Sequence, residues 1–176
     1  MQVPTYTDAF IADILGSART IAMIGASGAS NRPSYFAMTY LLGKNYHIIP
    51  VNPALAGHTI LGVPVYATLG EVSGPVDIVD IFRNSAAALG VTREAIALRH
   101  HLAIKVIWMQ LGVVNHDAAA EAEAAGLKVV MNRCPKIEDG RLSGAIGWAG
   151  VNPGAISAKR PLLGARGVQN RVIARS

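Results

Sequence analysis

The sequence predicts an α/β protein in which a doubly wound, parallel sheet of five strands carries helices on both faces. Five short apolar runs alternate along the chain with segments whose apolar residues recur at helical spacing. Strands that alternate with helices form a parallel sheet with right-handed crossovers. Of the 176 residues, 51% are hydrophobic and only 15% are charged, which suits a sheet that is covered on both faces.

The first half of the chain is expected to hold two strands and two helices. Residues 8–18 have apolar side chains at helical spacing behind a candidate cap at Thr7 or Asp8, and they predict a helix. The first strand is 20–24 and the second is 47–51. The helix between them, 33–43, begins at a proline, which is favourable at a first helical position.

The second half of the chain predicts three more strands, each after a turn or loop. These strands span residues 76–82, 104–109 and 127–131, and helices span 85–100 and 115–125. Beyond residue 131 the pattern predicts no regular element.

This pattern suits a Rossmann-like sheet, with strand order 3-2-1-4-5 when the strands are numbered along the chain. A ligand then belongs outside the carboxyl ends of the strands, at the switch point between the first and the fourth strand. Polar residues gather in the loops at that edge, which are residues 25–34, 51–53, 82–85, 109–113 and 132–135.

Residues 25–34, called here the Gly/Ser-rich loop, carry the strongest functional signal. Gly25 ends an apolar strand, small residues follow, and Arg32 precedes Pro33 at the expected helix start. Small residues let the backbone approach an anion, and a helix start offers unpaired N–H groups and a positive dipole. Arg32 adds a cation that can bind two phosphate oxygens. The loop predicts a phosphate site, and a tight turn without a ligand is the alternative.

All of the excess positive charge lies at the end of the chain. The formal net charge is +5, but residues 1–156 carry 11 basic and 11 acidic side chains. We therefore expect one domain, 1–156, and a basic C-terminal tail, 157–176. No aromatic residues interleave with the charges of the tail, so nothing indicates a nucleic-acid partner. The tail could pack on a second copy, which leaves a homo-oligomer open.

The chain has the features of a cytoplasmic protein. No apolar run approaches the ~20 residues of a membrane helix, so no membrane partner is expected. The first residues lack the basic and apolar regions of a signal peptide. The single cysteine, Cys134, excludes an internal disulfide.

Six short motifs occur in order along the chain. They are Gly-x-Ser with Asn-Arg-Pro-Ser, Val-Asn-Pro, Gly-Val-Pro-Val-Tyr, Asp-Ile-Phe-Arg, Trp-x-Gln-x-Gly and Asn-x-Cys-Pro. Together they resemble the stand-alone coenzyme A (CoA)-binding domain proteins, relatives of the N-terminal domain of the succinyl-CoA synthetase alpha subunit. The resemblance covers about residues 7–148. It implies non-catalytic binding of CoA or an acyl-CoA, because the second domain of the synthetase subunit is missing.

The resemblance also assigns site residues. Those that would hold the CoA diphosphate are Gly25, Ala26, Ser27, Arg32, Pro33 and Ser34. Those that would line the adenosine end are Val51, Asn52 and Pro53. Those that would border the nucleotide and the pantetheine are Phe82, Arg83 and Asn84. The thiol is expected near Gln110 and Cys134.

Two of these expectations leave alternatives. The family often has a Lys or Arg after the proline of Val-Asn-Pro, to meet the 3′-phosphate. Ala54 stands there in this chain, and Arg32, Lys44 and His58 are the candidate replacements.

Cys134 lies near Arg133 and Lys136, and nearby cations lower the pKa of a thiol. A reactive thiolate is therefore the alternative to a small buried side chain. Asp80, inside the third strand, is expected to accept a hydrogen bond rather than to act in acid–base chemistry.

Two other functions remain open. One is an NAD(P)-dependent oxidoreductase, which the doubly wound pattern supports. The loop lacks the G-x-G-x-x-G spacing and no acid follows the second strand, which speaks against NAD. NADP would need Arg32 or Lys44 at its 2′-phosphate. The other function is that of a CoA-binding subunit of an acyl-CoA synthetase whose catalytic domain is on another chain.

Overall fold

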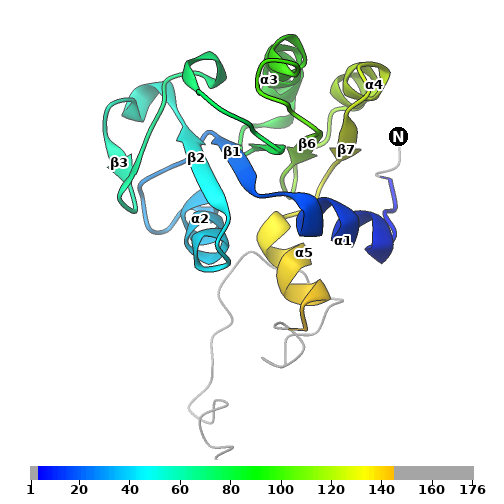
Figure 1. Cartoon of the computed structure of the whole chain (residues 1–176), viewed down its shortest axis with the longest axis horizontal. Helices are drawn as coiled ribbons and strands as arrows, with labels where there is room; N and C mark the ends of the chain where they lie inside the picture. Colours follow the sequence, from blue (N-terminus) through cyan, green and yellow to red (C-terminus); the bar gives the residue numbers. More distant parts are fainter. Residues whose placement is uncertain (1–3, 145–176) are drawn as a thin grey trace, which may run out of the picture.

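A computed structural model describes residues 4–144 and shows the expected five-stranded parallel sheet (Figure 1). Its strands are β1 (Thr20–Ile24), β2 (His47–Val51), β5 (Ile78–Ile81), β6 (Val106–Met109) and β7 (Lys128–Val130). Each strand begins and ends within two residues of its predicted bounds. The strands are almost entirely buried because both faces of the sheet are covered.

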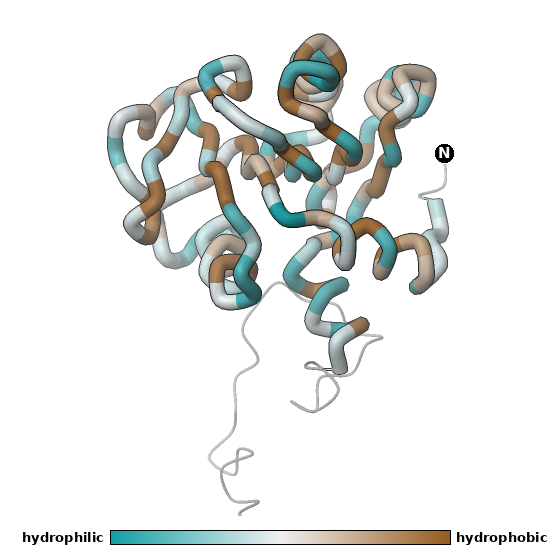
Figure 2. Tube along the Cα trace, in the orientation of Figure 1, coloured by the Kyte–Doolittle hydropathy of each residue, from teal (hydrophilic) through white to brown (hydrophobic). Residues whose placement is uncertain are grey.

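Helices cover both faces, as predicted. On one face lie α1 (Asp8–Ser17), α2 (Pro33–Gly43) and α5 (Pro135–Leu142), and on the other lie α3 (Ser85–Leu98) and α4 (His116–Ala124) (Figure 1). Successive strand residues point to opposite faces, so Ala22 packs toward α3 and α4 while Met23 packs toward α1 and α2. The hydrophobic residues accordingly follow the strands (Figure 2).

The predicted strand order, 3-2-1-4-5, is wrong. Numbered along the chain, the five strands lie in the order 2-1-3-4-5, because β5 pairs with β1 and not with β2. Tyr66 forms a parallel bridge to Val51, donates its backbone N–H to Pro50 and accepts from Asn52. This extended segment occupies the free edge of β2, so β5 joins the free edge of β1. The switch point therefore lies between β1 and β5.

The link from β2 to β5 contains no α-helix. It holds two short 3-10 helices, η1 (Pro53–Leu55) and η2 (Leu69–Glu71), and a small hairpin of β3 (Thr59–Ile60) and β4 (Val63–Pro64). The hairpin lies beside the Gly/Ser-rich loop, since a Cβ added to Gly28 would lie 3.8 Å from the Ile60 side chain.

Helix α5 was not predicted. It starts at a proline, and an acid in its first turn and a base in its last turn complement the helix dipole. Arg141 fastens α5 to α1, because its guanidinium lies 2.8 Å from both Asp8 and Glu138. Residues 145–156 of the expected domain and the expected tail, 157–176, lie outside the described residues. Across residues 4–144, no helix is both long and apolar enough to cross a membrane.

Candidate functional site

The Gly/Ser-rich loop and the segment after β5 meet at the carboxyl edge of the sheet. Gly25 has a φ of +88°, and a Cβ built on it would lie 2.8 Å from Cδ of Arg83. Glycine is therefore needed both for the backbone turn and for the approach of the arginine. The Gly25 N–H also donates to the Val51 carbonyl, at 2.8 Å, which ties the loop to the end of β2. The predicted residues of the diphosphate, adenosine and pantetheine groups thus come together here, through Gly25, Val51 and Arg83.

Asn52 holds the Gly/Ser-rich loop in place. Its Nδ2 donates to the carbonyl of Ala26, at 2.7 Å, and its Oδ1 accepts from the backbone of Ala54, at 3.0 Å. Each end of the amide therefore has one partner in the protein, and these bonds fix the orientation of the side chain. One N–H and one lone pair remain, so Asn52 shapes the site and can still contact a ligand.

The two serines assigned to the diphosphate differ in how freely their hydroxyl groups can bond to an anion. Ser34 is buried, and its hydroxyl accepts from the Ser27 backbone, at 3.1 Å. Ser27 Oγ accepts from the Ala29 backbone, at 3.2 Å, which leaves the proton of its hydroxyl free to donate. Ser27 is therefore the better candidate for a direct contact to an anion.

Arg32 and Arg83 are exposed and lie at opposite ends of the same loop. Arg32 occupies the N-cap position of α2, and Arg83 lies against Gly25. Within residues 4–144, six other cationic side chains pair with carboxylates, whereas these two arginines have no acidic partner. The other three cations without an acidic partner have different contacts: Arg19 and Arg99 donate to backbone carbonyls, and Lys136 lies over the Phe36 ring. Their charges add to the positive end of the α2 dipole and favour an anion there.

The other residues predicted at this edge are mostly part of the framework. Val51 is buried at the end of β2, and Phe82 is half-buried with its N–H bonded to Ile24. Asn84 caps α3, because its Oδ1 accepts from the Ala87 backbone at 2.9 Å. Pro33 and Pro53 begin α2 and η1. These residues lie where the sequence places them, but few have free polar groups.

Asp80 and Gln110 form a buried polar pair beneath the same edge. Asp80 is fully buried on β5, and both of its carboxyl oxygens lie 2.9 Å from Nε2 of Gln110. Burial raises the pKa of Asp80 well above its usual range, and the bond from Gln110 opposes this only in part. The expected hydrogen bond is confirmed. The sequence signal for this pair was an acid, Asp80, inside the predicted strand 76–82.

Cys134 does not have the environment of a reactive thiol. It is buried directly before α5, and burial raises its pKa to about 11, with a further contribution from Asp80. Arg133 pairs with Glu138, and the ammonium of Lys136 lies over the Phe36 ring. Lys136 does lower the pKa of the thiol, as expected, but burial outweighs this effect and leaves the pKa raised.

Cys134 is accordingly expected to resist modification in the folded protein. With a pKa near 11, the thiolate fraction at pH 7 is about one in 10,000, and it rises about tenfold per pH unit. A thiol reagent followed by intact mass spectrometry should label the native protein slowly at pH 7, faster toward pH 10, and at once after unfolding. Rapid labelling, or an adduct with CoA disulfide at pH 7, would contradict the buried, protonated thiol.

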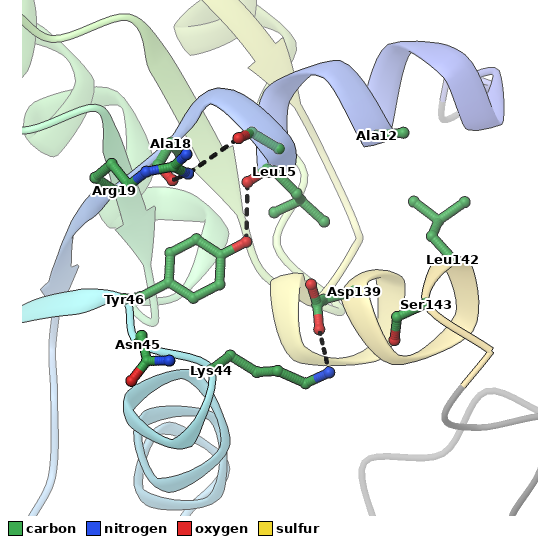
Figure 3. A pocket seen from close by; sticks show the side chains of 11 residues that line it. Ala12, Leu15, Ala18, Arg19, Lys44, Asn45, Tyr46, Asp139, Leu142 and Ser143 are labelled. Carbon is green, nitrogen blue, oxygen red and sulfur yellow. Dashed lines mark hydrogen bonds and ion pairs between the residues drawn. The ribbon is translucent and has the colours of Figure 1, made fainter.

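A pocket of about 420 Å³ lies at the opposite, amino edge of the sheet (Figure 3). It is formed where the carboxyl-terminal ends of α1, α2 and α5 meet. The Lys44 side chain extends along it, and its Nζ lies 3.6 Å from Oδ2 of Asp139. Lys44 is thus at the far end of α2 from Arg32, about 18 Å along the helix axis. This position excludes Lys44 as a phosphate contact at the carboxyl edge.

Three comparisons show which known proteins this chain is similar to. The family model of the CoA binding domain matches residues 19–140. The uncharacterized protein YneT of Bacillus subtilis (strain 168) is 34% identical over 137 residues, which cover 78% of this chain and 96% of the relative. The structure of cell-free ID.343 from Thermus thermophilus is 33% identical with a TM-score of 0.72, over 78% of this chain and 99% of its own.

A more distant structure shares the fold alone. Dinucleotide forming acetyl-coenzyme A synthetase 1 of Ca. Korarchaeum cryptofilum, in complex with phosphate and ADP, is 21% identical with a TM-score of 0.57. The match covers 69% of this chain and 27% of the synthetase. The resemblance drawn from the six motifs is confirmed by the family model and by the relatives above 30% identity. The chain therefore belongs to the CoA binding domain family.

Proposed function

We propose that this protein binds CoA or an acyl-CoA at the carboxyl edge of its sheet, without catalysing a reaction. The diphosphate lies against the Gly/Ser-rich loop and the first turn of α2. The observation that carries this proposal is the pair of exposed arginines, Arg32 and Arg83, which flank this loop without acidic partners among residues 4–144. Membership of the family supports CoA as the anion.

The start of α2 supports the phosphate contact. Helices α1, α3 and α4 each have a side-chain cap, from Thr7, Asn84 and Asn115. Helices α2 and α5 start without one, and the Arg32 side chain at the N-cap position of α2 cannot accept a hydrogen bond. Pro33 has no N–H, and the Tyr35 N–H donates to the Arg32 carbonyl, at 3.1 Å. Within the described residues the Ser34 N–H is therefore the first-turn donor left for an external acceptor, and a phosphate oxygen satisfies it well.

Binding without catalysis fits the chemistry of the site residues. Among the described residues that the sequence assigns to the site, the Cys134 thiol is buried with a raised pKa and Ser27 has no basic partner in its hydrogen bonds. An NAD site would use a carboxylate after β2, but Asn52 stands there and its amide is already bonded on both sides. The site thus favours recognition of CoA over hydride transfer.

Isothermal titration calorimetry of the full chain with CoA, NAD and NADP tests the proposal. CoA should bind most tightly, and acetyl-CoA in a fourth titration should show whether acylation is tolerated. Binding of NADP without binding of CoA would overturn the proposal.

A further inference from the structure

The Gln110 side chain has a defined orientation. Gln110 directly follows β6 at the carboxyl edge, and its Nε2 lies 2.9 Å from both carboxyl oxygens of the fully buried Asp80. The amide nitrogen therefore faces inward, and the amide oxygen, Oε1, is turned away from Asp80. Asp80 thus decides which end of the Gln110 amide is presented to the site.

The Gln110 oxygen is not sealed from solvent, although the residue as a whole is buried, with 6% of its surface exposed. Oε1 accepts no hydrogen bond from any residue of the described range, 4–144. Among the side-chain nitrogen and oxygen atoms of that range, Thr92 Oγ1 is the one that is sealed from solvent and has no hydrogen-bond partner. Gln110 Oε1 also has no partner, so it is not one of the sealed atoms. Oε1 is therefore open, and its position after β6 places the opening at the carboxyl edge.

The distance from the loop suits one part of CoA. β6 is the second strand from β1 on the side of β5, and neighbouring strands lie about 4.8 Å apart, so Gln110 lies roughly 10 Å along the sheet from the Gly/Ser-rich loop. With the diphosphate at that loop, this position is reached by the pantetheine arm and not by the phosphates.

We propose that Gln110 Oε1 accepts a hydrogen bond from a donor on the pantetheine arm of CoA, an amide N–H or the thiol S–H, and that Asp80 is the positioning residue that keeps this oxygen outward. This inference rests on the proposed function. An outward oxygen favours donors and disfavours acceptors, so it contributes specificity for the arm that the two arginines cannot supply.

The variant Asp80→Asn tests the positioning. An asparagine amide offers a donor as well as an acceptor, so it no longer holds the Gln110 amide in the single orientation that an ionised carboxylate imposes. Calorimetry should show a loss of CoA affinity of up to about tenfold, the effect of one hydrogen bond to a ligand. The affinity for 3′-phosphoadenosine 5′-diphosphate, which lacks the arm, should stay unchanged. A purely structural defect would weaken both ligands.

Desulfo-CoA, which keeps the amides but lacks the thiol, separates the two donors. If wild type prefers CoA to desulfo-CoA and Asp80→Asn removes that preference, the donor is the thiol. If wild type binds both equally and the variant weakens both, the donor is an amide.

Two further variants keep the test decisive. Gln110→Met removes the acceptor with little change of shape and should reproduce the selective loss for CoA, even if Asp80→Asn folds poorly. Thr92→Val removes a buried hydroxyl from α3, on the other face, and should leave both affinities unchanged. Equal effects of Asp80→Asn and Gln110→Met on both ligands, or no effect on either, would overturn the inference. Wild-type protein that binds neither ligand would instead refute the proposed function.

Discussion

Replacing Arg32 with alanine is expected to weaken CoA binding by more than tenfold. A hydrogen bond to a charged group contributes about 1.5–3 kcal/mol, and Arg32 is the cation at the N-cap position of α2. The side chain is exposed and has no acidic partner within residues 4–144, so folding should be almost unaffected. Calorimetry with CoA measures the first effect, and thermal unfolding measures the second.

Arg93→Ala is the matched control for charge. Arg93 is exposed on α3 and forms an ion pair with Glu121, at 2.6 Å, on the face opposite α2. Its removal changes the net charge equally but should leave the affinity within about threefold, since an exposed ion pair contributes little. Arg83→Ala should resemble Arg32→Ala, and a dissociation constant unaffected by either loss would place the arginines outside the site.

Local patterns were sufficient to predict the strands and most helices. Each predicted strand is bounded by turn residues, and Asn84 and Asn115 cap helices close to their predicted starts. The strand order depends instead on a pairing between residues far apart in the chain. Nothing near Tyr66 indicates that it lies along β2, yet that contact decides where β5 can join the sheet.

The site shows the same division between local and long-range information. Because Gly25, Arg83 and Gln110 each follow a predicted strand, the sequence correctly placed them at one edge of the sheet. It could not show that backbone groups hold the Asn52 amide at both ends. Nor could it show that the cations beside Cys134 face other partners, since burial and partner choice depend on the folded packing.

Replacing Asp80 with asparagine is expected to stabilise the protein at neutral and higher pH. In the unfolded chain an Asp ionises near its ordinary pKa of 3.8, whereas burial raises the pKa of Asp80 in the folded protein. Between these two values the folded state holds a proton that the unfolded state has released, so stability falls as pH rises through that window. Asparagine resembles the protonated carboxyl and removes this loss.

Thermal unfolding of wild type and Asp80→Asn from pH 4 to pH 9 measures this effect. The two should be similar at pH 4, and the variant should unfold at a higher temperature at pH 8, by about 2–4 °C for each kcal/mol gained. Asp77→Asn is the control, because the expected change in its melting temperature has the opposite sign. Burial raises the pKa of Asp77, but hydrogen bonds from Lys105 and from the backbone of Arg19 and Thr20 outweigh it and leave the pKa below its usual value.

Asp77→Asn should therefore lower the melting temperature above pH 4, whereas Asp80→Asn should raise it. Equal pH profiles for wild type and Asp80→Asn would show that the buried carboxyl does not reduce stability. If Asp80→Asn is more stable and also binds CoA less tightly, the chain keeps a destabilising acid at this position because it orients Gln110. A buried carboxyl whose only side-chain partner within residues 4–144 is an amide then has a functional reason, which packing alone does not provide.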